Sequence, residues 1–260
     1  MISKIIHYTW FSGEEMPSDV KRCMESWRKI MPEYELRKWD MESLKEIDSV
    51  FLKEALQERK WAYAADFVRL YAVYYYGGIY LDTDVQVYKP FDRFLQDKAF
   101  IGKESSIHFG KIGSYQGLSS HCFGAEKGHP FIKSCLDYYQ DRHFITSSVK
   151  ELPNELRQNI VTLPFIQALI GNQIGYNWNP SFQQEQSLEH GLKIYPAYFF
   201  DPFQGKTVNR SKSYCLHLAV GSWRENYSCG KTKNSLVERL IIRVLGSIFH
   251  RMHYCLIKFS

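Results

Sequence analysis

Two carboxylates separated by one residue, Asp82 and Asp84, are the side chains in this chain whose type and spacing are best suited to chemistry. The alternation of residues from Ile79 to Tyr88 predicts a strand, on which the two aspartates share one face with Cα atoms roughly 6.6 Å apart. Two carboxylates at the point where a buried strand emerges are suited to a hard divalent cation that carries a diphosphate. The triplet alone is also compatible with a solvated strand end.

The residues before this pair predict a helix that leads the chain directly to it. Apolar residues recur at three- and four-residue steps over 61–76, which is typical of a helix. Asp66 and Arg69 lie three residues apart and therefore share a face of that helix. Gly77 and Gly78 then fit a C-terminal cap, where one residue must adopt positive φ. Charged side chains on two consecutive elements are thus expected to meet.

This segment resembles the sugar-nucleotide-binding core of the glycosyltransferases with the DXD motif, and most of all glycosyltransferase family 32. That family includes yeast α-mannosyltransferases, bacterial capsule enzymes and, more distantly, the large clostridial glucosylating toxins. The resemblance lies in an A-D-x-x-R helix at 65–69 and the run Y-G-G-x-Y-x-D-x-D at 76–84. It covers residues 1–230, with further matches at 4–10 and 217–223.

The resemblance implies an α/β fold of the GT-A type, in which helices flank a mixed central sheet. At 260 residues the chain is long enough for one such domain. The patterns predict strands at 4–10 and 34–39 around an amphipathic helix at 17–31, in the βαβ order of a nucleotide-binding half. Residues 105–120, rich in Gly and Ser, predict a loop that borders the acceptor cleft. A helix is expected to resume at Pro164 beside that cleft.

The resemblance also implies which residues bind the donor. Trp10 matches the aromatic that stacks on the base, although a core tryptophan is the alternative. Asp66 is expected to accept hydrogen bonds from sugar hydroxyls, and Arg69 to hold sugar and phosphate oxygens. Residues 221–230 are expected to form a mobile lid over the diphosphate. The expected donor-binding residues are Tyr8, Trp10, Asp66, Arg69, Gly78, Ser222 and Trp223.

The expected metal ligands are Asp82, Asp84 and His217. His217 begins an H-x-x-x-G-S-W run that forms the second anchor of the resemblance, and imidazole is a common ligand of divalent metals. A structural histidine at a strand end is the alternative. The implied cofactor is Mn²⁺ or Mg²⁺, which would neutralise a departing diphosphate as a Lewis acid. The catalytic set is therefore Asp66, Arg69, Asp82 and Asp84.

The implied reaction moves a hexose from a nucleoside diphosphate sugar, in particular a UDP-hexose, to a hydroxyl of a free or lipid-linked glycan. The family retains anomeric configuration, and bacterial capsule, exopolysaccharide or lipopolysaccharide synthesis is the expected setting. Two alternatives belong to other classes. A phosphatase of the haloacid dehalogenase type also has D-x-D after a strand, but it needs a later D-D pair that this chain lacks. A non-catalytic sugar-binding relative would normally show a broken DXD motif, and this one is intact.

Composition and charge indicate the cellular compartment in which the protein is expected. The six cysteines form no C-x-x-C pair, which indicates reduced thiols. We find no signal peptide and no uncharged apolar run of 18 residues, so a cytoplasmic protein is expected. Residues 231–260 carry six basic residues against the single acid Glu238, a net charge of +5 that equals the charge of the whole chain. This second segment predicts an amphipathic helix. It either packs on the core or lies on anionic lipid at the inner membrane face; nucleic acid is the less favoured partner.

Overall fold

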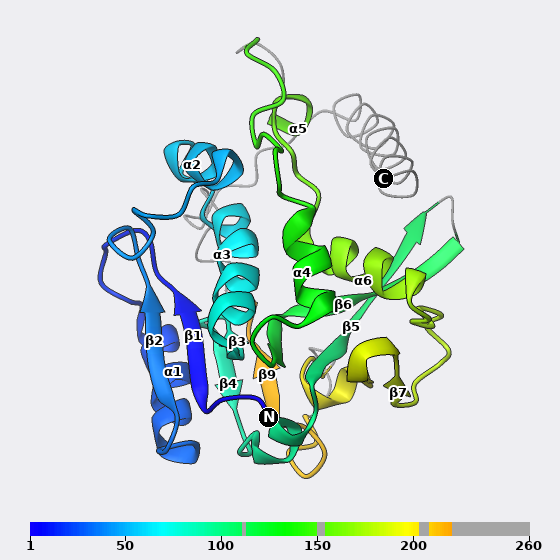
Figure 1. Ribbon diagram of the computed structural model, residues 1–260. Helices are drawn as coiled ribbons and strands as arrows, with labels where there is room; N and C mark the ends of the chain where they lie inside the picture. The colour runs from blue at the N-terminus through cyan, green and yellow to red at the C-terminus, as the bar shows by residue number, and fades with distance from the viewer. Residues whose placement is uncertain (111–112, 150–153, 203–207, 220–260) are drawn as a thin grey trace, which may run out of the picture.

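The computed structural model describes residues 1–110, 113–149, 154–202 and 208–219 (Figure 1). The predicted lid at 221–230, with Ser222 and Trp223, and the predicted basic helix at 231–260 lie outside the described residues. Within them, one sheet has the strand order β2-β1-β3-β6-β5-β8-β7, and a small second sheet pairs β4 with β9.

The N-terminal half has the predicted βαβ order. Strand β1 (Ile5–Thr9) leads into α1 (Ser18–Ile30) and then β2 (Glu35–Trp39), which lies parallel to β1. Helix α3 (Trp61–Tyr76) next brings the chain to β3 (Gly78–Leu81), which is parallel to β1 on its other side. Since β3 pairs antiparallel with β6, the central sheet is mixed. The predicted α/β fold with a mixed sheet and flanking helices is therefore confirmed.

The Gly- and Ser-rich stretch at 105–120 forms a hairpin, so the predicted loop is wrong. Strands β5 (Ala99–Gly110) and β6 (Gly113–Ala125) pair antiparallel along this region. Two glycines of these strands pack closely against other side chains. A Cβ added at Gly102 would lie 2.8 Å from the Phe200 ring, and one added at Gly117 would lie 2.1 Å from the Glu104 carboxylate. Gly102 and Gly117 thus allow close packing along the paired strands.

The remaining elements complete the two sheets and their cover. They are α2 (Val50–Gln57), β4 (Val85–Val87), η1 (Asp92–Gln96), α4 (Pro130–Asp137), α5 (Asn154–Arg157), α6 (Leu163–Gln173), β7 (Gln186–Ser187), η2 (Glu189–Gly191), β8 (Leu192–Tyr195), η3 (Ala197–Phe199) and β9 (Cys215–His217).

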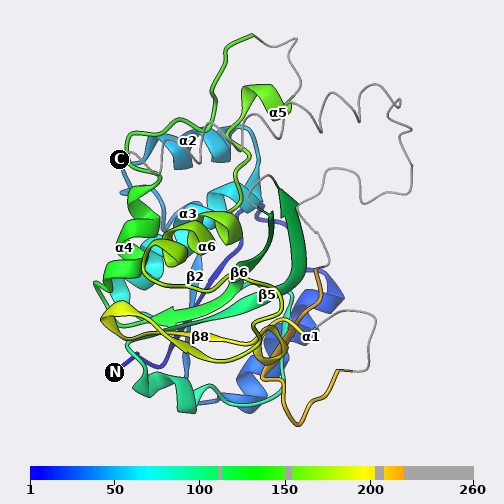
Figure 2. The same cartoon turned by 90° about the vertical axis from the view of Figure 1, so that its right-hand side faces the viewer.

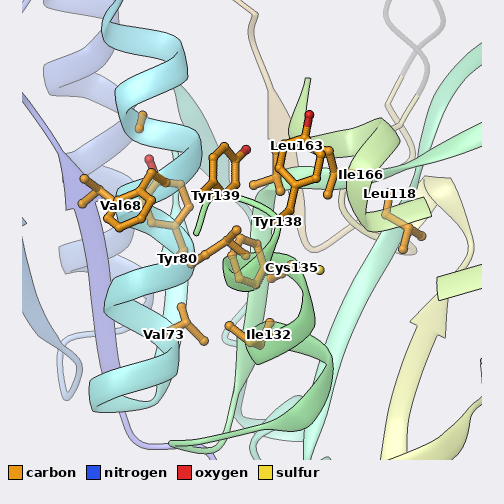
Figure 3. Close-up of a cluster of buried hydrophobic side chains, with 14 of the residues drawn as sticks. Val68, Val73, Tyr80, Leu118, Ile132, Cys135, Tyr138, Tyr139, Leu163 and Ile166 are labelled. Carbon is orange, nitrogen blue, oxygen red and sulfur yellow. The ribbon is translucent and has the colours of Figure 1, made fainter. Parts of the chain in front are cut away.

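Helices cover both faces of the sheet, with a hydrophobic cluster on each side (Figure 2). Helices α2, α3, α4 and α6 enclose one cluster, in which side chains such as Val73, Ile132 and Ile166 meet between helices (Figure 3). Helix α1 encloses the other, where buried Trp27 donates its indole N–H to the Val85 carbonyl at 2.7 Å. That bond fixes β4 under α1, directly after the Asp82–Asp84 segment.

A double glycine joins α3 to β3, as the sequence predicts. Gly77 has φ +67° and Gly78 has φ +103°, conformations that L side chains rarely adopt. A Cβ on Gly78 would lie 2.7 Å from the Ile5 carbonyl oxygen. Gly78 is thus required for close packing on β1, and it does not line the cleft described below, so its predicted donor contact is not supported.

Buried His7 fastens this turn from the neighbouring strand. Its Nδ1 accepts the Trp39 indole N–H at 3.1 Å, so its Nε2 carries the proton and donates to the Gly77 carbonyl at 2.8 Å. Burial lowers the pKa of His7 to about 4, which keeps the ring neutral at physiological pH. The turn that aims β3 is therefore held by a single neutral tautomer.

Candidate active site

The Asp82–Asp84 segment is a turn between two sheets, here called the DXD turn. The continuous strand predicted over 79–88 is wrong, because β3 ends at Leu81, the chain turns with Val85 N–H donating to the Asp82 carbonyl at 3.0 Å, and β4 begins in the second sheet. Strand β4 leaves the plane of β3 because it pairs with β9. The two carboxylates converge through the turn rather than through strand alternation.

Pairing with β9 brings His217 to the DXD turn. Val85 lies opposite His217 in the antiparallel register, and Leu218 N–H donates to the Asp84 carbonyl at 3.0 Å. One ligand atom each from Asp82, Asp84 and His217 lie within 4.8 Å of one another. His217 Nε2 is 3.2 Å from Asp84 Oδ1. The structure therefore brings together all three residues that the sequence assigned to a metal.

The donor set of these three residues suits a divalent cation. Carboxylate oxygens are ligands for both Mg²⁺ and Mn²⁺, and one imidazole nitrogen favours the transition metal. Burial would lower the pKa of His217, but the hydrogen bond and the negative charge of Asp84 outweigh it and raise the pKa overall. The two carboxylates repel each other, and a bound divalent cation would offset this repulsion. The arrangement thus fits the metal that the resemblance implies.

Arg69 is the buried cation beside the DXD turn. Arg69 is 5% exposed, and its guanidinium lies 3.4 Å from Asp66 Oδ1 and 3.2 Å from Asp82 Oδ1. It also donates to the Ser120 carbonyl at 2.7 Å and lies over the Tyr80 ring, 4.7 Å from its centroid. These partners use most of its donors. Arg69 lines the cleft, yet its contacts in the structure hold Asp82 and Asp66 rather than leaving the guanidinium open to a ligand.

Asp66 lies on the cleft wall where α3 meets α6. Its Oδ2 accepts the Leu163 N–H at 3.2 Å, and the residue is buried. Burial raises the pKa of Asp66 to about 6, even though Arg69 acts in the opposite direction. A carboxyl group in this position can accept a hydrogen bond from a ligand hydroxyl, as the resemblance implies.

The two aromatic residues predicted at the end of β1 have different surroundings. Trp10 is half-buried, lines the cleft and donates its indole N–H to the Glu14 carbonyl at 2.8 Å. Tyr8 points to the opposite face, where its ring packs edge-on against Trp27 with centroids 6.0 Å apart. Tyr8 does not line the cleft, so its predicted contact with substrate is not supported. Thr9, the next residue along β1, does line the cleft.

The cleft has a volume of about 700 Å³ and extends well beyond the predicted site. One wall comes from the end of β1, the start of α3 and the DXD turn. The other comes from the β5–β6 hairpin, which includes the 105–120 stretch expected to border the acceptor cleft, and from the segment after η3; the sequence analysis named no individual site residue on this wall. The missed polar residues are Glu104, Ser105, Ser106, Ser120, His121 and Asp201.

His121 connects the new wall to the metal cluster. Its ring stacks on His217 with centroids 4.3 Å apart and planes at 19°. Its Nε2 lies 3.2 Å from the Phe200 carbonyl oxygen, and its own carbonyl accepts the Asp82 N–H at 2.9 Å. Burial lowers the pKa of His121 to about 4. A neutral His121 therefore supports both sides of the cluster. The signal in the sequence was a histidine at a buried strand position, which strand assignment would have revealed.

Comparison with known proteins agrees with this geometry. Residues 17–101 match the family described as the glycosyltransferase sugar-binding region containing the DXD motif. The resemblance predicted from the sequence is thus confirmed over these residues, which include the DXD motif.

Two curated proteins are similar to about half of this chain. Inositol phosphoceramide mannosyltransferase 3 of Schizosaccharomyces pombe is 34% identical over 135 residues, covering 50% of this chain and 35% of the relative. Mannosyl phosphorylinositol ceramide synthase of Saccharomyces cerevisiae is 28% identical over 140 residues, covering 52% of this chain and 34% of the relative. The chain thus spans about a third of the length of these relatives. A solved glycosyltransferase involved in glycosylation of the major capsid of PBCV-1 has a TM-score of 0.44 and 11% identity, over 83% of this chain and 94% of that one.

No helix in the described part of the chain is long and apolar enough to cross a membrane.

Proposed function

We propose that this protein is a metal-dependent glycosyltransferase that moves a hexose from a nucleoside diphosphate sugar to a hydroxyl group of an acceptor. The observation that carries the proposal is the convergence of Asp82, Asp84 and His217, whose ligand atoms lie within 4.8 Å of one another on the wall of a cleft. A DXD turn intact in both sequence and geometry argues against the non-catalytic alternative. The absence of a later D-D pair argues against the phosphatase.

The charge of the cleft supports a requirement for metal. Seven carboxylates line it, and Arg69 is the one Lys or Arg side chain among its described lining residues; the acids are Glu14, Glu15, Asp66, Asp82, Asp84, Glu104 and Asp201. An anionic diphosphate entering such a cleft would be repelled. A divalent cation on the DXD turn would reverse the local charge where the phosphates bind.

The residues of this chain then have separable roles. When bound, Mn²⁺ or Mg²⁺ would neutralise charge that develops on the departing diphosphate. Trp10 would stack on the base at the end of β1, a contact available to any nucleobase. Asp66 would accept hydrogen bonds from the sugar hydroxyls. Arg69 would keep the Asp82 and Asp66 carboxylates oriented, because it already contacts both.

Donor and acceptor are proposed from the relatives. Both of the curated relatives described above are named for mannosyl transfer, and both names include inositol-containing ceramide lipids. Mannose is therefore the first sugar to test on a nucleoside diphosphate, beside the UDP-hexoses that the family resemblance implies. A glycan or glycolipid head group is the proposed acceptor class. Three points remain predictions from the sequence: capsular or lipopolysaccharide synthesis, a cytoplasmic location and contact with an anionic membrane.

Donor hydrolysis tests the proposal directly. The protein is incubated with a panel of UDP- and GDP-hexoses, with Mn²⁺, with Mg²⁺ or with EDTA, and release of the nucleoside diphosphate is measured. We expect hydrolysis of at least one donor with metal and none in EDTA. Asp137→Asn is the matched control, because this carboxylate is exposed and pairs with Lys133 on the surface. Binding without turnover would indicate the non-catalytic relative, and phosphate release from monoesters would indicate the phosphatase.

A further inference from the structure

Glu104 is a carboxylate on the cleft wall that the metal cluster does not use. It lies on β5, across the cleft from the α3 wall that carries Asp66. In the described residues, Asp82, Asp84 and His217 are the one group of His, Cys, Asp and Glu side chains compact enough to hold a metal ion. Glu104 therefore needs a different explanation for its place in an already acidic cleft.

The structure holds Glu104 by one oxygen. Its Oε2 is 2.9 Å from His108 Nε2, and the His108 ring stacks on Tyr115 with centroids 5.2 Å apart and planes at 22°. Tyr115 in turn packs against Phe165 and Trp178. In the described part of the chain, Oε1 makes no hydrogen bond. One oxygen is thus anchored to the hairpin, while the other remains for a ligand.

Room for this carboxylate comes from a missing side chain. Gly117 has an ordinary negative φ, so its backbone does not require glycine. A Cβ at this position would lie 2.1 Å from Glu104 Oε2 and 2.9 Å from its carboxyl carbon. The absence of a side chain at 117 is therefore explained by the position of the Glu104 carboxylate. Such a supported orientation is expected of a binding residue.

Asp201 provides a second carboxylate with the same arrangement. Its Oδ2 accepts both the N–H and the hydroxyl of Ser105, at 2.7 and 3.0 Å, and the residue is 9% exposed. Burial raises the pKa of Glu104, and the negative charge of nearby Asp201 adds to the effect. Two neighbouring carboxylates, each anchored by one oxygen, disfavour an anionic group and favour hydroxyl donors.

We propose that Glu104 binds the acceptor: it accepts a hydrogen bond from a hydroxyl of an uncharged ring polyol, with Asp201 accepting a second. This inference rests on the proposed function and names the chemical class of the group that enters the second half of the cleft. Phosphate or carboxylate groups of a larger acceptor must then lie outside this wall. The donor, held between Trp10 and the DXD turn, does not need Glu104.

Separating transfer from hydrolysis tests the assignment. Donor hydrolysis without acceptor is compared with transfer to two neutral probes, myo-inositol and methyl α-D-mannopyranoside, for the wild type, Glu104→Gln and Gly117→Ala. We expect hydrolysis within about twofold of the wild type in both variants. The KM for the acceptor should rise about 10- to 100-fold in Glu104→Gln, the loss expected for one charge-assisted hydrogen bond. Gly117→Ala should act in the same direction, because the new Cβ displaces the carboxylate. Asp137→Asn is again the control.

Three outcomes would overturn the inference while leaving the proposed function intact. The first is an acceptor KM that does not change in Glu104→Gln. The second is a folded variant that loses donor hydrolysis and transfer to the same extent. The third is a wild type that hydrolyses the donor but transfers sugar to neither probe. The melting temperature of each variant shows whether it is folded. If Glu104→Gln does not fold, the acceptor KM of Gly117→Ala, which keeps the carboxylate, tests the inference instead. A wild type that hydrolyses no donor would refute the proposed function, and this inference with it.

Discussion

Replacing Arg69 with methionine would remove the cation that pairs with buried Asp66 and half-buried Asp82. Arg69 is 5% exposed, and its guanidinium lies within 3.4 Å of both Asp66 and Asp82. Methionine keeps much of the volume beside Tyr80 but supplies no charge and no donor. The variant therefore isolates the electrostatic contribution, which an alanine would combine with a cavity.

The expected loss of stability is large. Removing one partner of a buried ion pair costs about 3–5 kcal/mol, because the remaining charge is left without compensation. Proton uptake by Asp66 can relieve part of this cost, since burial already raises its pKa to about 6. The unfolded state releases this proton near its ordinary pKa, whereas the folded variant retains it to higher pH. Stability then falls as pH rises through that window, so the loss should be smaller at pH 5 than at pH 8.

Urea unfolding at pH 5 and pH 8, in EDTA and followed by tryptophan fluorescence, measures both effects. Arg22→Met is the matched control, because Arg22 forms an exposed pair with Asp19 and its loss should cost below about 1 kcal/mol. Adding Asp66→Asn to Arg69→Met should restore part of the stability and remove most of the pH dependence. A loss below about 1 kcal/mol at pH 8, or one that is equal at both pH values, would refute the assignment of Arg69 as the neutralising residue.

Three further predictions concern the metal, the donor and the glycine turn. Asp84→Asn should abolish metal-stimulated donor hydrolysis while urea unfolding in EDTA changes by about 1 kcal/mol or less, as for an isosteric change; full turnover of the wild type in EDTA would contradict the metal-dependent mechanism. Trp10→Ala should weaken UDP binding by roughly 1–3 kcal/mol in calorimetry, and an unchanged affinity would make Trp10 a packing residue. Because burial lowers the pKa of His7 to about 4, the unfolded state gains a proton first as pH falls. The stability of the wild type should therefore decline between about pH 6.5 and 4, by up to about 3 kcal/mol. His7→Gln should reduce this decline, as measured by urea unfolding across the same pH range. An equal dependence of stability on pH in the wild type and the variant would contradict the role of His7.

Local signals were sufficient to predict the segment that leads into the site. Helical spacing over 61–76, followed by two glycines, predicted α3 and its cap, and the structure confirms both. The same stretch placed Asp66 and Arg69 on one helix face, where they form an ion pair. These features depend on contacts between residues close in sequence, and such contacts leave a periodic pattern that can be recognised.

The hairpin was not predicted because a stretch rich in Gly and Ser resembles a loop, whereas strand pairing depends on the residues of the partner strand. Gly102 packs against the Phe200 side chain, and Gly117 packs against the Glu104 carboxylate. Neither partner can be identified from local periodicity, so the small residues looked like a loop. As a consequence, the cleft residues on these strands, including Glu104 and His121, were not predicted as site residues.

The DXD turn shows why three residues predicted to act together do converge, although the local structure predicted around them was wrong. The identities of Asp82, Asp84 and His217 indicated metal chemistry, but an unbroken strand would have pointed the chain away from His217. Nothing between Leu81 and Val85 is a glycine or proline that would mark a turn. The turn forms because Val85 pairs with His217 and Val87 with Cys215 in a sheet closed by residues far along the chain. The pairing that bends the chain also delivers the third ligand, so substitutions that weaken β9 should impair metal binding without changing any ligand.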